Sequence, residues 1–281
     1  MRWTPGDRSN IEDMRGRSGF GMRAGGLGIG GLLVLLLLSW VTGVDLLSLF
    51  GGGAGPAPSE TVGTSGSVKA TPEEERLVDM VDVVVGDSQE MWGDLLGGRY
   101  EPTRAVLFRD AIQSACGFAQ AATGPFYCPA DRKVYLDLGF FNELHRRFGA
   151  PGDFAQAYVI AHEIGHHVQT VTGIESQVRS RQASSPAQRN ALSVRMELQA
   201  DCFAGVWGHH ANRGGGDVQL DPGDVDEGLR AAAAIGDDRL QRMSGGRISP
   251  ESFTHGSAEQ RVTWLRRGLE SGNPDACNTF Q

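Results

Sequence analysis

The segment His162-Glu163-Ile164-Gly165-His166 constrains the fold more than any other part of the chain. It continues an apolar stretch of helical periodicity that begins at Phe154. Residues four apart share one face of a helix, so the two imidazoles can bind one metal ion. Glu163 lies next to them around the helix, where its carboxylate reaches a water at the metal rather than the metal itself. The motif predicts a metal-binding helix with Glu163 as general base, although two hydrogen-bonded histidines on a helix remain the alternative.

A second predicted helix supplies the third ligand that a catalytic metal needs. Glu197 and Asp201 are four apart on one helix face, among the apolar residues Met196, Leu198, Phe203 and Val206. Carboxylates on such a flank are seldom buried unless they are paired or bind metal. We therefore predict Glu197 as the third ligand and Asp201 as the acceptor that orients a ligand histidine. The alternative is a solvent-exposed helix face.

His255 has two possible roles, because it directly precedes another predicted helix. It either caps that helix with Ser257 nearby, or reaches the metal site and stabilises an oxyanion. His167 is rotated by about 100° around its helix from His166, so we predict a packing or hydrogen-bonding role for it.

The N-terminal part of the chain predicts a membrane anchor. Residues 24–44 are 21 residues without a charge, which is long enough to cross a bilayer. Five arginines precede them and Asp45 follows, so the positive-inside rule places the N-terminus in the cytoplasm and the rest outside. A cleaved signal peptide is the competing interpretation, but its apolar region is shorter.

The predicted organisation therefore has four parts: a cytoplasmic head of residues 1–23, a transmembrane helix of residues 24–44, a flexible Gly/Pro/Ser-rich linker of residues 45–70 and a soluble domain of residues 71–281. The net charge of −8 argues against a nucleic-acid partner. We expect an α+β domain, mainly helical with a small sheet. Helices are predicted near residues 73–95, 138–148, 154–172, 186–212, 223–243 and 257–270, and short strands near 105–108, 115–120, 124–128 and 134–137.

The four cysteines are expected to form disulfides, because an exported domain favours oxidised thiols. Cys116 and Cys128 lie in what we predict to be adjacent strands, and Cys202 then remains to pair with Cys277. Four cysteines allow three arrangements, so the connectivity stays open. Cys116 is alternatively a metal ligand, as the upstream cysteine is in peptide deformylases.

These residues resemble the bacterial putative neutral zinc metallopeptidase family. The resemblance rests on the segments 162–169 and 197–207 and extends to residues 1–3, 10–16, 124–129, 134–141 and 254–264. It implies a zincin-like domain in which Zn²⁺ lies between one helix bearing His162 and His166 and a second bearing Glu197. In zincins an edge strand holds the substrate as an added strand, and by analogy residues 124–127 or 134–137 serve here.

The predicted function is that of a membrane-anchored zinc metallopeptidase acting on peptides or proteins outside the cytoplasmic membrane. Glu163 and His255 are the predicted catalytic residues. One alternative is a zinc amidase acting on cell-wall peptides or small amides, and another is a non-catalytic domain that binds zinc or a partner. Structural zinc sites usually have four protein ligands rich in cysteine, which favours catalysis here.

Overall fold

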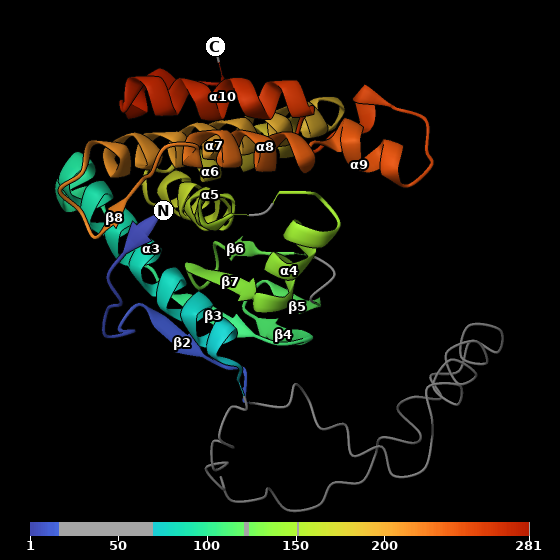
Figure 1. The fold of residues 1–281 in the computed structure, drawn as a ribbon. Coiled ribbons are helices and arrows are strands. Elements are labelled where there is room, and N and C mark those ends of the chain that lie inside the picture. The colour runs from blue at the N-terminus through green and yellow to red at the C-terminus, as the bar shows by residue number, and fades with distance from the viewer. Residues whose placement is uncertain (17–69, 121–123, 151, 281) are drawn as a thin grey trace, which may run out of the picture. The chain divides into compact units, whose positions relative to one another are not determined.

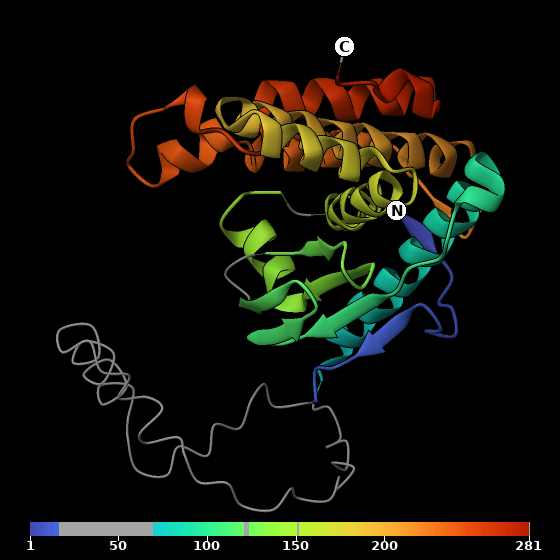
Figure 2. The same cartoon turned by 180° about the vertical axis from the view of Figure 1, so that it is seen from behind.

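The helix that carries the histidine motif, α5 (Asp153–Val171), lies between a layer of helices and a small sheet (Figures 1 and 2). The computed structural model describes residues 1–16, 70–120, 124–150 and 152–280. Fourteen of the residues of α5 are buried. A helix that is covered on nearly every side forms the centre of the core, so the predicted metal-binding motif lies on the best-packed element.

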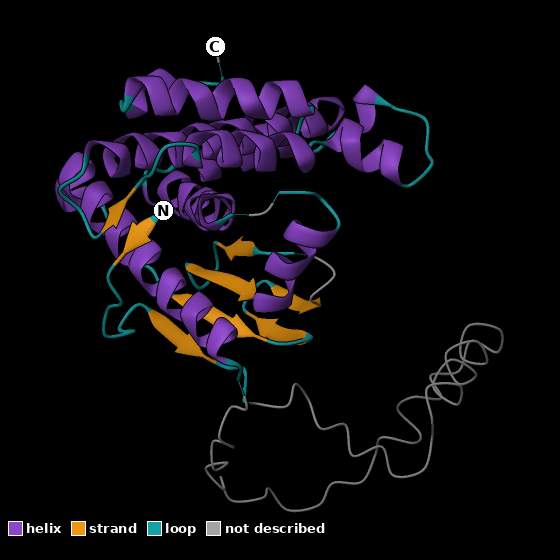
Figure 3. Ribbon diagram, in the orientation of Figure 1, coloured by secondary structure: helices purple, strands orange, loops and turns teal. Residues whose placement is uncertain are grey.

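The described residues form an α+β fold, as predicted, with more helix than strand (Figure 3). The other helices are α3 (Pro72–Leu96), α4 (Leu138–Arg146), α6 (Ile174–Ser184), α7 (Arg189–Arg213), α8 (Asp224–Ala234), α9 (Asp237–Met243) and α10 (Ala258–Ser271). The strands are β1 (Arg2–Trp3), β2 (Ile11–Asp13), β3 (Ala105–Phe108), β4 (Ala111–Ser114), β5 (Gly117–Gln120), β6 (Phe126–Cys128), β7 (Lys133–Asp137) and β8 (Val218–Gln219).

The main sheet has the strand order β2-β3-β7-β6. Strands β2, β3 and β7 are parallel, whereas β6 runs antiparallel to β7 at one edge. Ala105 and Leu107 of β3 join the main core, while Val106 and Phe108 join a second cluster that includes Ile112 of β4. Because neighbouring residues of a strand face opposite sides, both faces of this sheet are covered.

The helix ends follow local signals that the sequence carries. The side chain of Thr71 accepts a hydrogen bond from the backbone of Glu74 at the start of α3. Ser257 and Gln260 form a reciprocal capping box at the start of α10. The predicted helix over residues 223–243 is wrong in one respect, because α8 and α9 are separate helices that meet at Gly236. Helix α6 was not predicted, since only Val178 of it is buried.

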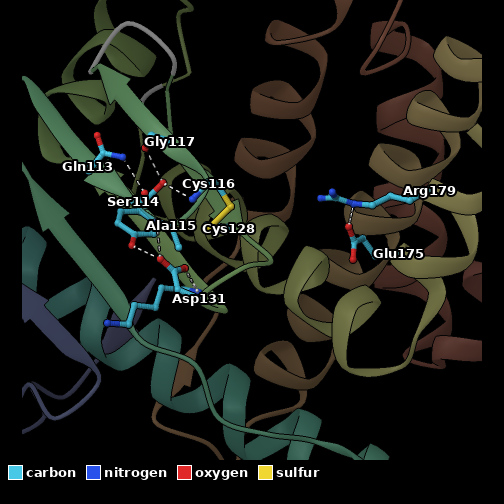
Figure 4. The surroundings of a disulfide bond; sticks show 11 residues. Gln113, Ser114, Ala115, Cys116, Gly117, Cys128, Asp131, Glu175 and Arg179 are labelled. Atoms are coloured by element: carbon cyan, nitrogen blue, oxygen red, sulfur yellow. Dashed lines mark hydrogen bonds and ion pairs between the residues drawn. A yellow bond between two sulfur atoms is a disulfide. The ribbon is translucent and has the colours of Figure 1, made fainter. Parts of the chain in front are cut away.

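Both predicted disulfides are present. Cys116 pairs with Cys128, which joins the turn between β4 and β5 to β6 (Figure 4), and Cys202 of α7 pairs with Cys277. No cysteine of the described residues is free. The alternative in which Cys116 ligates the metal is therefore excluded, because its sulfur is already bonded.

Residues 1–16 belong to the same compact unit as the residues after the linker. Strand β1 pairs antiparallel with β8, and β2 pairs in parallel with β3. The buried guanidinium of Arg15 lies within 3.1 Å of Glu74 and 2.9 Å of Glu75 on α3. Residues 1–16, which the sequence assigns to the cytoplasmic head, therefore pack as part of the domain in this structure.

This packing bears on the predicted topology. All parts of one compact unit lie on the same side of a membrane. If residues 1–23 are cytoplasmic and the later domain is external, β1 and β2 must separate from their partner strands, β8 and β3. The predicted anchor at residues 24–44 and the linker lie outside the described residues. No helix among the described residues is long and apolar enough to cross a membrane.

A cysteine cross-link in living cells tests the N-terminal pairing. Trp3 of β1 lies opposite Val218 of β8, and directly opposed residues of an antiparallel pair bring their Cβ atoms within about 4.5–5.5 Å. We expect the double variant Trp3→Cys, Val218→Cys to form a third disulfide. When a protease has cut the chain between positions 3 and 218, this disulfide keeps the two fragments joined and shifts the band on a non-reducing gel. Trp3→Cys with Gln219→Cys is the control, because successive residues face opposite sides of a strand. A thiol at position 3 that stays reduced and cytoplasmic while Cys202 and Cys277 of the same chain are oxidised would show that β1 is undocked in the cell.

Candidate metal centre

Three side chains from two helices converge on one point. His162 and His166 extend from α5, and Glu197 extends from α7. Glu197 Oε2 lies 3.2 Å from His162 Nε2, and Glu197 Oε1 lies 3.5 Å from His166 Nε2. One potential ligand atom from each residue lies within 4.8 Å of the others. The spacing of four within α5 thus places both imidazoles against the same carboxylate.

Close packing of the two helices makes this convergence possible. A Cβ atom at Gly165 would lie 3.0 Å from the backbone oxygen of Ala200. The absence of a side chain at Gly165, between the two histidines, therefore lets α7 approach α5 closely.

Asp201, which the sequence predicts to orient a ligand histidine, contacts the ring of His162. Its Oδ1 lies 2.8 Å from His162 Nδ1 and accepts a 2.6 Å hydrogen bond from the hydroxyl of Tyr158. Arg261 of α10 donates to both oxygens of Asp201, each over 2.9 Å. Because a carboxylate can only accept, Nδ1 of His162 carries the hydrogen and Nε2 is left for a metal.

The electrostatics keep Asp201 charged although it is fully buried. Burial alone would raise the pKa of Asp201, but the charges of Arg261 and His162 outweigh it and lower the pKa to about 2. Burial likewise opposes protonation of His162, but Asp201 and Glu197 raise its pKa to about 10. Burial would also raise the pKa of Glu197, yet the two imidazoles hold it well below its usual range. A divalent metal bound between His162, His166 and Glu197 competes with the protons that the two imidazoles otherwise bind.

The donor set fits zinc. Two neutral imidazole nitrogens and one carboxylate are among the three-ligand sets of catalytic zinc, which keep a further position for water or substrate. The second nitrogen of each imidazole already has a partner, Asp201 for His162 and Gln169 for His166. Among the described residues, His162, His166 and Glu197 form the group whose ligand atoms meet closely enough for one ion.

Glu163 lines a cavity of about 590 Å³ together with the three potential ligands. The cavity is also bordered by residues of β6 and the segment before it, by α6, and by His255. Glu163 is buried, with 7% of its surface exposed. The cavity thus brings the predicted general base, the potential metal ligands and a solvent-accessible space together.

His255 reaches the cavity, and the alternative capping role falls to other residues. Ser257 and Gln260 complete the cap of α10 without it. His255 Nδ1 lies 3.2 Å from Asp237 Oδ1, and the hydrogen bond to this carboxylate raises the pKa of His255. The backbone of the loop also binds Asp237, whose Oδ2 accepts from the N–H groups of Thr254, His255 and Gly256.

His167 has the hydrogen-bonding role predicted for it. It is fully buried, with Nδ1 3.0 Å from the hydroxyl of Tyr127 and Nε2 2.6 Å from the carbonyl of Glu101. Both of its nitrogens are occupied, so His167 is not part of the metal-binding group.

Several residues of the site were not assigned a role from the sequence: Tyr158, Gln169, Gln199, Asp237 and Arg261. Two of them carried a local signal, because Tyr158 is four residues before His162 and Gln169 three residues after His166 on the same helix. Asp237 and Arg261 carried none, since only the tertiary fold brings α9 and α10 to the cavity.

Comparison with known proteins agrees with this geometry. The family model described as "Putative neutral zinc metallopeptidase" matches residues 1–280. The chain is 45% identical over 294 residues to "Uncharacterized protein YpfJ" of Escherichia coli (strain K12), covering 100% of this chain and 99% of YpfJ. It is 42% identical over 214 residues to "Uncharacterized protein Rv2575" of Mycobacterium tuberculosis (strain ATCC 25618 / H37Rv), covering 73% of this chain and 71% of Rv2575.

No solved structure matches the chain. The family model spans both the N-terminal strands and the metal-binding helices. The family name implies Zn²⁺, and His162, His166 and Glu197 are the group that can bind it. The chain therefore belongs to the putative neutral zinc metallopeptidase family.

Proposed function

We propose that the protein is a zinc-dependent peptidase in which His162, His166 and Glu197 hold the metal. The observation that carries this proposal is the convergence of these three side chains at the wall of a cavity that Glu163 also lines. A site with three protein ligands and an adjacent acid is suited to hydrolysis, whereas structural zinc is usually enclosed by four ligands.

Each residue then has a defined task. The bound zinc polarises the scissile carbonyl and lowers the pKa of water. Glu163 accepts a proton from the attacking water and later transfers it to the leaving amine. His255, held by Asp237, donates a hydrogen bond to the oxygen that becomes negatively charged. Asp201 holds the His162 ring in the orientation that binding requires.

The edge of the sheet is suited to hold a peptide substrate. Strand β6 lies at the end of the strand order, and Phe126 and Tyr127 line the cavity. An extended peptide can add to such an edge through backbone hydrogen bonds. Of the two segments considered from the sequence, residues 124–127 are favoured, because β7 pairs with β3 along one side and with β6 at residues 133–135 along the other.

The proposal also places the domain outside the cytoplasmic membrane. Two disulfides support this location, because disulfides persist in oxidising compartments and are rare in the cytosol. The membrane anchor at residues 24–44 stays a prediction, and the cross-link between β1 and β8 tests the side on which the N-terminus lies.

The pH dependence of hydrolysis tests the role of His255. If protonated His255 stabilises the oxyanion, activity is present below its pKa and lost as the pH rises through that pKa. Asp237 raises the pKa of His255, so Asp237→Asn is expected to move the alkaline limb of kcat/KM to lower pH. Asp238→Asn is the matched control, because Asp238 binds the backbone of Ala258 instead. His255→Ala should lower kcat by roughly 10²–10³, and an unchanged alkaline limb in that variant would exclude His255 as its source.

The proposed function is tested with the full-length protein purified in detergent. We expect one zinc per chain by elemental analysis, and cleavage of an unfolded protein substrate that stops with a chelator and returns with added zinc. Bound zinc without cleavage of either unfolded protein or cell-wall peptides would contradict the peptidase and favour a binding role. Absence of zinc from the freshly purified protein, and from protein incubated with zinc, would overturn the proposal.

A further inference from the structure

The ring of His166 needs a partner for its Nδ1 atom, as the ring of His162 does. This partner is Gln169, whose Oε1 lies 2.9 Å from His166 Nδ1. Gln169 follows His166 by three residues on α5 and is fully buried. A buried amide in this position can set both the orientation and the protonated nitrogen of the imidazole.

The surrounding hydrogen bonds allow only one orientation of the Gln169 amide. Its Nε2 lies 2.8 Å from the backbone oxygen of Met196 and 3.1 Å from Gln199 Oε1. A backbone carbonyl only accepts hydrogen bonds, so the NH₂ group of Gln169 must face Met196. Oε1 therefore faces His166, and Nδ1 of His166 must donate. In the neutral imidazole, Nε2 of His166 is then the nitrogen without a hydrogen, and it is available to the metal.

Gln199 continues this chain of hydrogen bonds to the C-terminal segment. Its Nε2 donates to the backbone oxygen of Cys277 over 3.0 Å, which leaves its Oε1 to accept from Gln169. The backbone carbonyls of Met196 and Cys277 can only accept hydrogen bonds, so they fix which group donates and which accepts in each hydrogen bond of this chain. We name Gln169 and Gln199 the glutamine relay.

The far end of the relay is held covalently. Cys277 ends a short 3₁₀ helix, Pro274–Cys277, and its disulfide joins it to Cys202 of α7. Cys202 lies three residues after Gln199 on the same helix, so the disulfide fixes the Cys277 carbonyl over the Gln199 amide. Thr279 adds a hydrogen bond to the backbone oxygen of Arg195, but the disulfide is the covalent link closest to the relay.

We propose that the glutamine relay positions His166 for metal binding, and that the Cys202–Cys277 disulfide strengthens zinc binding by holding the end of this relay. The inference rests on the proposed zinc site and adds to it a coupling between a disulfide and metal affinity. Gln169 and Gln199 act through His166 and are positioning residues. The chain would reach its full zinc affinity only after this disulfide forms.

Zinc affinity, measured by competition with a chromophoric chelator, tests the inference without reference to activity. Gln169→Leu removes the acceptor of His166 and is expected to weaken zinc binding roughly 10–100-fold, the usual effect of losing such a partner. Gln199→Leu and the pair Cys202→Ala with Cys277→Ala should weaken it less, because they act further from the metal. The pair Cys116→Ala with Cys128→Ala is the matched control, since it removes a disulfide outside the relay, and should leave zinc affinity within twofold of wild type.

A double-mutant cycle distinguishes a loss of zinc affinity transmitted through the glutamine relay from a loss caused by general destabilisation of the fold. Once Gln199→Leu has broken the relay, removing the Cys202–Cys277 disulfide should produce little further loss of zinc affinity, whereas independent effects would add. Circular dichroism checks that each variant is folded, and Gln199→Leu remains informative if Gln169→Leu does not fold. Wild-type zinc affinity in both glutamine variants, or full additivity of Gln199→Leu with loss of the disulfide, would overturn the inference. Absence of zinc from the wild-type protein would instead overturn the proposed function on which it rests.

Discussion

Glu163→Gln is expected to lower kcat for peptide hydrolysis by roughly 10²–10⁴ while zinc stays bound, the range that a positioned general base supplies. The amide has nearly the shape of the carboxylate but cannot take a proton from water. His162, His166 and Glu197 are unchanged, so the metal group keeps its geometry. Steady-state kinetics and zinc content of the same preparation give both readouts.

Glu175→Gln is the matched control for this substitution. Glu175 lines the same cavity but forms an ion pair with Arg179 on α6 (Figure 4). We expect the control to keep activity within a few-fold of wild type. Full activity of Glu163→Gln would remove Glu163 from the reaction and require another base in the cavity.

Glu197→Ala is expected to cause the largest loss of metal, leaving zinc below stoichiometry and hydrolysis near background. The carboxylate is the third potential ligand, and its removal leaves two imidazoles without the negative charge that draws a cation into the buried site. Zinc per chain after dialysis is the direct measurement, and kcat/KM with excess zinc shows how much activity metal can restore.

The result has a clear alternative outcome. A full complement of zinc in Glu197→Ala would place the third ligand elsewhere in the cavity. Glu175→Ala serves as the control for loss of a glutamate from the same cavity and should retain zinc. Near-ultraviolet circular dichroism distinguishes loss of zinc from loss of the fold.

Much of the local structure was predictable, because the residues that determine it lie close to one another in the sequence. The periodicity of the apolar residues predicted α3, α5 and α10 to within two residues at each end. The spacing of His162 and His166 predicted a shared face, and the apolar neighbours of Asp201 predicted its burial. The structure confirms the predicted pairing of Cys116 with Cys128 but not its basis in adjacent strands, because Cys116 lies in the turn between β4 and β5 and these two strands form a sheet separate from that of β6.

The N-terminal strands were not predictable in this way. Strands β1 and β2 have two and three residues, too few to show a periodicity. Their partners, β8 and β3, lie more than 90 residues away in the chain. The arginines of residues 1–23 instead suggested a cytoplasmic head. The sequence shows a positive charge but not which carboxylate pairs with it in the folded protein. Arg15 illustrates this, since Glu74 and Glu75 on α3 pair with it.

The sequence by itself determined which residues are able to bind a metal, because helical geometry sets the spacing of His162 and His166 wherever the helix lies. Only the tertiary structure decided how they are held. Contacts across 60 residues bring Arg261 to Asp201, and the glutamine relay reaches 78 residues from Gln199 to Cys277. Such contacts depend on the packing of α5, α7 and α10 against one another, and a local pattern contains no information about which distant side chain will fill a buried hydrogen-bonding position.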